Sequence, residues 1–136
     1  MNKLIRAAAF DPDIAAAGVE VTYSPDGKST FRTTIRQGGA SNNAYAKELE
    51  EQFRPFRQSG LDPNDLDVEV QRKIIATALA KTVIIGWNAD DFEAPFSVQL
   101  AIDTMMAVPG YAAFLTTQSG KENLFRKKSI EDASGN

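Results

Sequence analysis

Polar and apolar residues alternate in two short stretches near the start of the chain, at residues 19–23 and 31–36. Between them, Pro25 presets the backbone of a turn and Gly27 supplies a left-handed residue, so the pattern predicts a β-hairpin over about residues 19–36. One face of this hairpin carries the apolar side chains Val19, Val21, Tyr23, Phe31 and Ile35. Because a two-stranded ribbon alone is marginally stable in water, we expect it to lie on helices or to join strands of another chain.

A helical pattern follows in residues 43–57. Apolar side chains recur there every three or four positions, at Tyr45, Leu49, Phe53 and Phe56. Ser41 or an adjacent asparagine is placed to cap this helix. Pro55 has no backbone N–H, so we expect the helix to kink or end there.

The strongest helical pattern runs over about residues 67–85. Its polar positions form a narrow stripe at intervals of four, namely Glu69, Lys73, Thr77 and Lys81. Apolar residues cover most of the remaining circumference, and a helix with this pattern is buried on more than one side. It is therefore either the central element of the domain, or part of its surface is reserved for a neighbouring subunit.

Two further helices are predicted in the C-terminal part. Ser97 is placed to cap a helix over residues 98–108, with Phe96 packing back on its first turn. Pro109 preorganises the first turn of the next helix. The large apolar side chains of these two helices include Met105, Met106, Tyr111 and Phe114.

Together these elements predict a mainly α-helical protein of the α+β class, in which an N-terminal β-hairpin precedes a bundle of about four helices. The length of 136 residues suits a single domain, which we place at residues 1–128. Within it, residues 1–18 are expected to form a loose arm or a short helix. The small and polar residues 129–136 are expected to form a disordered tail.

The composition excludes several kinds of chemistry. The chain has no cysteine and no histidine, which rules out disulfides, thiolate ligands, cysteine nucleophiles and the commonest general base. A net charge of −3 and a pI near 5.0 offer no basic field for nucleic acid. The apolar run at residues 83–85 is too short to cross a bilayer. Asp11 and Asp13 interrupt a faint signal-peptide pattern, so we expect a cytoplasmic protein.

No catalytic, cofactor-binding or metal-binding residues are expected from the motifs. The densest carboxylate cluster consists of Asp90, Asp91 and Glu93. It lacks the further oxygens at fixed offsets that a hard cation needs, so we interpret it as a solvated loop. Serines and lysines stand in no recognised nucleophile context, which favours a protein that is not an enzyme.

Trp87, the single tryptophan, ends the long apolar run and precedes these carboxylates. In one interpretation its large side chain closes the core where the helix ends. In the other it anchors a protein interface, because tryptophan is enriched among binding hot spots. The two are compatible if the core continues into a subunit contact. Met105 and Met106 leave the same choice between ordinary core and an adaptable recognition face.

Several short motifs follow one another in a particular order along the chain. They are GVEVTY at 18–23, FRTTIRQGG at 31–39, NNAYAK at 42–47, RPFR at 54–57, TVIIGWN at 82–88, PFS at 95–97, PGY at 109–111 and NLFR at 123–126. This succession resembles the tail assembly chaperones of long-tailed, siphovirus-type bacteriophages over nearly the whole chain. In that family the loop after the tryptophan is usually longer and has a glycine before the proline, whereas residues 88–94 here have none.

The resemblance implies a non-enzymatic assembly factor, made in the bacterial host cytoplasm as the short form of a frameshifted pair. Such chaperones coat the helical tape measure protein, keep it soluble, recruit tail tube subunits and are absent from the mature virion. With the apolar helix at 67–85, this leads us to expect a homo-oligomer, a ring or a spiral, whose grooves hold tape measure helices. The residues assigned to this protein-interaction surface are Trp87, Phe96, Met105, Met106, Tyr111 and Phe114.

Two other functions remain as alternatives. One is a small structural virion protein, such as a tail completion or head–tail joining subunit. The other is a small regulator of host enzymes or nucleic acid, although the acidic charge balance argues against nucleic acid.

Overall fold

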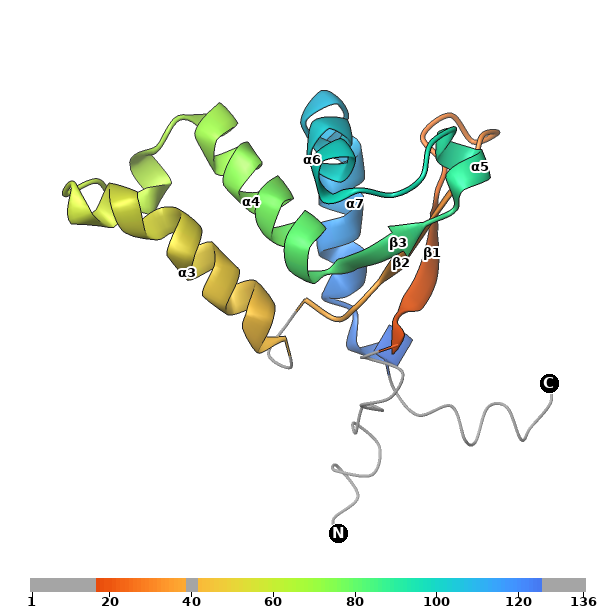
Figure 1. Ribbon diagram of the computed structural model, residues 1–136, viewed down its shortest axis with the longest axis horizontal. Helices are drawn as coiled ribbons and strands as arrows, with labels where there is room; N and C mark the ends of the chain where they lie inside the picture. Colours follow the sequence, from red (N-terminus) through yellow and green to blue (C-terminus); the bar gives the residue numbers. More distant parts are fainter. Residues whose placement is uncertain (1–16, 39–41, 126–136) are drawn as a thin grey trace, which may run out of the picture.

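The computed structural model describes residues 17–38 and 42–125, which form a three-stranded antiparallel sheet with helices on one of its faces (Figure 1). The strands are β1 (Val19–Tyr23), β2 (Phe31–Ile35) and β3 (Ile84–Trp87). The helices are α3 (Asn43–Gln58), α4 (Val68–Thr82), α5 (Ala89–Phe92), α6 (Val98–Ala107) and α7 (Pro109–Ser119), with 3-10 helices at Pro63–Asp65 and Glu122–Phe125. The predicted α+β class is confirmed.

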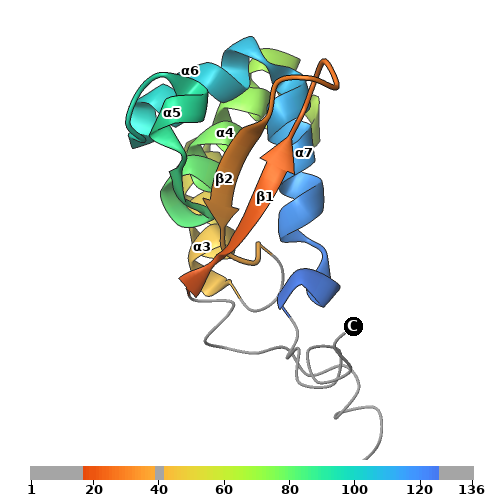
Figure 2. The ribbon, with the colours of Figure 1, turned by 90° about the vertical axis from the view of Figure 1, so that its right-hand side faces the viewer.

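The hairpin forms where the alternating pattern placed it. Strands β1 and β2 pair from Val19 opposite Ile35 to Tyr23 opposite Phe31. Gly27 has a φ of 73°, the left-handed backbone that the turn requires and that glycine adopts without strain. The apolar face of the hairpin lies on the helices, and no helix of residues 17–38 and 42–125 covers the opposite face (Figure 2). The hairpin was expected to lie on helices or to pair with strands of another chain, and in the structure it lies on helices.

It also has a third strand, which the sequence pattern did not predict. The helix expected to reach residue 85 ends at Thr82, and the chain continues as β3. This strand pairs with β2, with Trp87 opposite Thr33 and Ile84 opposite Ile35. The run of β-branched residues at 83–85 favours extended backbone, and pairing along β2 satisfies its amides. The prediction of a helix through residue 85 was therefore wrong.

Helix α3 begins at the predicted place but does not end at its proline. The side chain of Asn42 accepts a hydrogen bond from the backbone N–H of Tyr45, so an asparagine caps the helix as expected. Pro55 lies inside the helix, which runs on to Gln58. A proline removes one backbone hydrogen bond from a helix. Because Pro55 lies only three residues before the end of α3, the last turn persists without that bond. Ser59 Oγ, in turn, donates to the carbonyl of Pro55.

Helix α4 is the central element, which is one of the two alternatives that its apolar circumference allowed. It packs against α3 on one side and against α6, α7 and β3 on the other. Its buried residues are Ile74, Ala76, Ala78, Leu79, Ala80 and Thr82. Val68, its first residue, and Ile75, in its middle, remain 60% and 37% exposed, so α4 is incompletely enclosed over its N-terminal half.

The two C-terminal helices begin where the sequence predicted. Ser97 Oγ accepts the backbone N–H of Leu100 and so caps α6, and Pro109 occupies the first turn of α7. The axes of α6 and α7 are bent by 113° relative to each other. Helix α6 packs on α4, and helix α7 packs on α4 and β1. The two helices therefore do not run alongside each other as in a bundle.

Three segments lie outside the described residues, namely 1–16, 39–41 and 126–136. The expected N-terminal arm falls almost wholly in the first of them. Ser41, the alternative helix cap, falls in the second. The expected disordered tail at 129–136 falls in the third, and so does the end of the proposed domain at residue 128.

Candidate protein-docking surfaces

Trp87 lies at the end of β3 in a cluster of aromatic rings. Its indole Nε1 donates a hydrogen bond of 2.9 Å to the carbonyl oxygen of Ala94. Its ring stacks on Phe92 with 3.9 Å between centroids, and the Phe96 ring meets it edge-on at 5.4 Å. Trp87 is half-buried and packs against the core. These contacts fit the interpretation in which Trp87 closes the core, and its second role as an interface anchor stays a prediction.

Ring contacts continue from this cluster to the C-terminal helices. Phe92 lies 5.8 Å from Tyr111, and Tyr111 lies 5.5 Å from Tyr23, centroid to centroid. Tyr23 in turn lies 5.1 Å from Phe114. The predicted site residues that this succession of contacts connects are Trp87, Phe96, Tyr111 and Phe114. Phe92 and Tyr23, which complete it, were not singled out from the sequence.

Burial separates the predicted interaction residues into two groups. Met105 and Tyr111 are 2% and 1% exposed and belong to the core. The Tyr111 hydroxyl shares a buried hydrogen bond of 2.7 Å with Thr33 Oγ1, and burial raises the pKa of Tyr111 to about 12. Met106 and Phe114 are partly buried against the same core. Met105 and Tyr111 are therefore core residues, and each also lines the floor of an apolar hollow.

The sequence predicted that the acidic residues 90, 91 and 93 lie in a solvated loop. This is wrong for one of them, Asp91. The Asp91 side chain is only 12% exposed. Its Oδ2 accepts hydrogen bonds from the backbone N–H of Arg32 and from Arg32 Nε, at 2.9 and 2.8 Å, and its Oδ1 accepts one from Nη2 at 3.0 Å. These hydrogen bonds lower the pKa of Asp91, and those from the Arg32 side chain have the largest effect. Asp90 and Glu93 are exposed.

Asp91 thus fastens helix α5 to strand β2. A second bond does the same, since the backbone N–H of Asn88 donates to the carbonyl of Arg32 at 2.9 Å. Helix α5 carries Phe92 into the aromatic cluster, so the carboxylate has a positioning role. The sequence offered no signal for it, because the partners are 59 residues apart.

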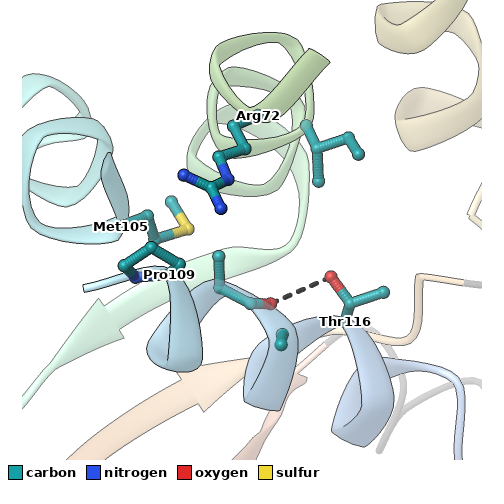
Figure 3. Close-up of a pocket in the computed structure, with 7 residues that line it drawn as sticks. Arg72, Met105, Pro109 and Thr116 are labelled. Atoms are coloured by element: carbon teal, nitrogen blue, oxygen red, sulfur yellow. Dashed lines mark hydrogen bonds between the residues drawn. The ribbon is translucent and has the colours of Figure 1, made fainter. Parts of the chain in front are cut away.

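An apolar groove lies between α4 and α7. It has a volume of about 180 Å³, and its lining residues are Arg72, Ile75, Met105, Pro109, Ala112, Ala113 and Thr116 (Figure 3). Arg72 is the single charged residue among them. Its Nη1 donates to Glu69 Oε1 at 3.0 Å at the surface. Of the predicted interaction residues, Met105 alone contributes to this groove.

A second hollow, of about 150 Å³, lies beside the hairpin tip. Its lining residues are Tyr23, Pro25, Phe31, Phe92, Thr104, Val108 and Tyr111. The two hollows lie on either side of the junction between α6 and α7. Pro109 lines the first and its neighbour Val108 lines the second. Val108 is exposed, so the turn between the two helices presents apolar surface on both sides.

Comparison with protein-family models, with curated protein sequences and with solved structures gives no match for this chain. Within the described residues, no group of three or more acidic, cysteine or histidine side chains is placed to hold a metal ion. No single helix of the same part has both the length and the apolar character to span a membrane. The bent pair α6 and α7 passes by length and composition alone.

Proposed function

We propose that this chain is a non-enzymatic tail assembly chaperone of a long-tailed bacteriophage or prophage. It binds the tape measure protein, keeps that protein soluble and recruits tail tube subunits. It acts in the host bacterial cytoplasm and is absent from the mature virion. The observation that carries the proposal is the ordered succession of motifs from residue 18 to residue 126.

Two motif glycines support the proposal, because a Cβ at either position would come closer than 3.0 Å to another side chain. Gly18 has a φ of 92°, and a Cβ there would come within 2.5 Å of Ile85 Cδ1. Gly110 follows the proline of the PGY motif, and a Cβ there would lie 2.8 Å from the Tyr23 hydroxyl oxygen. The first of these motifs therefore begins at a position where the backbone of this fold favours glycine.

The stretch around the tryptophan gives further support. Its residues form one connected unit, in which β3 joins the sheet, α5 is fastened to β2 through Asp91, and Ser97 caps α6. This unit carries Trp87, Phe92 and Phe96. It sets the position of the C-terminal helices, which border both apolar hollows.

A chaperone for a helical protein needs apolar surface and no reactive group. The chain has neither cysteine nor histidine. Its two hollows are lined almost wholly by uncharged residues and suit apolar side chains of a helical partner. Assembly into a homo-oligomer, a ring or a spiral, would repeat such grooves along an elongated partner.

The direct test is co-expression with the tape measure protein encoded in the same genome. We expect that protein to stay soluble and to copurify with this chain, and to aggregate without it. Unchanged solubility in the presence of the chain overturns the proposal. Mass spectrometry of purified particles tests the structural alternative, since a stoichiometric amount of this chain in mature virions would show a virion protein instead.

A further inference from the structure

The groove between α4 and α7 has two exposed walls with the same helical spacing. On α4, Val68, Arg72 and Ile75 stand at positions i, i+4 and i+7 and therefore share one face of the helix. The corresponding stripe on α7 consists of Pro109, Ala113 and Thr116, all exposed. A third helix laid between the two stripes would contact both at once.

The composition of the α7 wall favours such a close approach. Helix α7 contains no charged residue over its whole length, Pro109–Ser119. Its groove side carries alanine, proline and threonine, and such small side chains allow two helix backbones to come near each other. Depletion of charge is also what distinguishes the centre of a protein interface from ordinary surface. Met105 lies in the lining, where its flexible side chain adapts to an incoming group.

Arg72 indicates the charge of the occupant. It reaches from α4 over the groove toward Met105 and Pro109 (Figure 3). Its bond to Glu69 joins two side chains that are 48% and 67% exposed, and such surface pairs are weak. The guanidinium has five N–H donors, so it can bind a further carboxylate. The lining residues contain no carboxylate of their own, and Glu69, beside the groove, already pairs with Arg72 of the same chain, so an acidic side chain on the occupant would supply the missing charge.

We propose that this groove binds one amphipathic helical segment of the tape measure protein. The apolar stripe of that segment lies between α4 and α7, and an acidic residue beside the stripe pairs with Arg72. This proposal rests on the proposed function and assigns it a site. Since α7 has 11 residues, the bound segment needs about three helical turns to follow the groove.

The test uses the full chain and peptides of about 20 residues that tile the tape measure protein, each long enough for a helix of about 30 Å. Binding is followed by NMR spectroscopy of the labelled chain. We expect the largest shifts at Ile75, Ala113 and Thr116, caused by peptides with an acidic residue next to an apolar helical stripe. Ala113→Arg, which fills the groove, and Arg72→Glu, which reverses its charge, should each weaken that binding at least about tenfold.

Thr117→Arg is the matched control, because Thr117 is exposed on α7 and does not line the groove. It should leave binding unchanged, and all three variants should melt as the parent chain does. Undiminished binding by Ala113→Arg, with shifts elsewhere, overturns the groove but leaves the proposed function intact. Loss of self-association alone, measured by sedimentation, means that a second copy fills the groove and also overturns this site. If no peptide binds and the tape measure protein stays insoluble, the proposed function itself fails.

Discussion

Helices α3 and α6 both pack against α4, but they are held to very different degrees. Helix α3 contains no buried residue, and its large apolar residues, at 45, 49, 53 and 56, are only half-buried. Its main neighbour is α4. Helix α6 buries Ala101, Ile102 and Met105 between α4 and α7. In Figure 1 the pair α3 and α4 projects from one side, whereas the sheet, α6 and α7 surround the other side of α4.

The contrast shows where the stability of the domain resides. A helix that touches its neighbour through one face contributes less and opens at lower free energy than a helix enclosed by several elements. Helix α3 is therefore expected to be the least stable long element, and the side of α4 that faces α6, α7 and the sheet is the cooperative core. Four substitutions in or beside the core test this division, and each is compared with a control substitution.

Truncation of a core leucine should have the largest effect. Leu79 is 0% exposed, so Leu79→Ala should lower the free energy of unfolding by about 2–5 kcal/mol, because the cavity cannot refill. Leu49→Ala on α3 removes a half-buried side chain and should cost about 1 kcal/mol. Urea denaturation of both variants measures the difference. Equal losses would mean that α3 is part of the same cooperative core.

Removal of the tryptophan ring should rank second. Trp87→Ala removes the stacking on Phe92, the edge contact with Phe96 and the hydrogen bond to Ala94. For a half-buried ring we expect a loss of about 3 kcal/mol in thermal or chemical unfolding. Trp87→Phe retains a ring and should lose less. If Trp87→Ala melts unchanged and only assembly is lost, Trp87 is an interface anchor and not a core residue.

The same substitution, tyrosine to phenylalanine, at one core position and one position on α3 should change stability less than the tryptophan variant does. Tyr111→Phe leaves the buried Thr33 hydroxyl without its partner and should cost about 1–3 kcal/mol. Tyr45 lies half-buried on α3, and Tyr45→Phe should change stability by less than about 0.5 kcal/mol. Denaturant unfolding measures both. A neutral Tyr111→Phe would show that the hydroxyl pair contributes nothing to the core.

The same tyrosine predicts how stability depends on alkaline pH. The pKa of folded Tyr111 is about 12, above its ordinary value of 10.0. The unfolded chain therefore loses this proton first, so stability should fall as pH rises from 10.0 toward 12. Ultraviolet titration of the phenolate measures the pKa, and Tyr111→Phe should reduce the loss.

The ion pair at α5 should give the smallest effect, seen at acid pH. The pKa of Asp91 is lowered from its ordinary value of 3.8. The stability that it contributes is thus present above pH 3.8 and lost as pH falls through its folded pKa. Asp91→Asn should remove part of the acid dependence of unfolding. Glu50→Gln, at an exposed pair on α3, should remove less, and the reverse order would contradict the assignment of Asp91 as a positioning residue.

Elements that depend on neighbours in sequence could be predicted. The Pro25 and Gly27 turn, the caps at Asn42 and Ser97 and the start of α7 at Pro109 are local features, since each involves bonds or dihedral angles within a few residues. The end of α4 could not be predicted, because helix and strand compete at residues 83–85. Pairing with β2, whose partner residues lie about 50 positions earlier in the sequence, decides the outcome.

The candidate site also has a part that could be predicted from the sequence and a part that could not. Trp87 and the C-terminal apolar residues could be selected from the sequence because large apolar side chains mark core or interface wherever they lie. The groove could not, since it combines the stripe of Arg72 and Ile75 with that of Ala113 and Thr116. Each stripe is visible in the sequence, but only packing decides that α7 lies beside α4.

By itself the sequence thus determined the hairpin, the beginnings of α3, α4, α6 and α7, the acidic charge and the absence of histidine and cysteine, because these follow from composition and short-range backbone chemistry. The tertiary structure alone decided the third strand, the bond between Asp91 and Arg32, and which apolar residues are buried or line a groove. These depend on contacts between distant residues, whose formation is governed by the packing of the whole core.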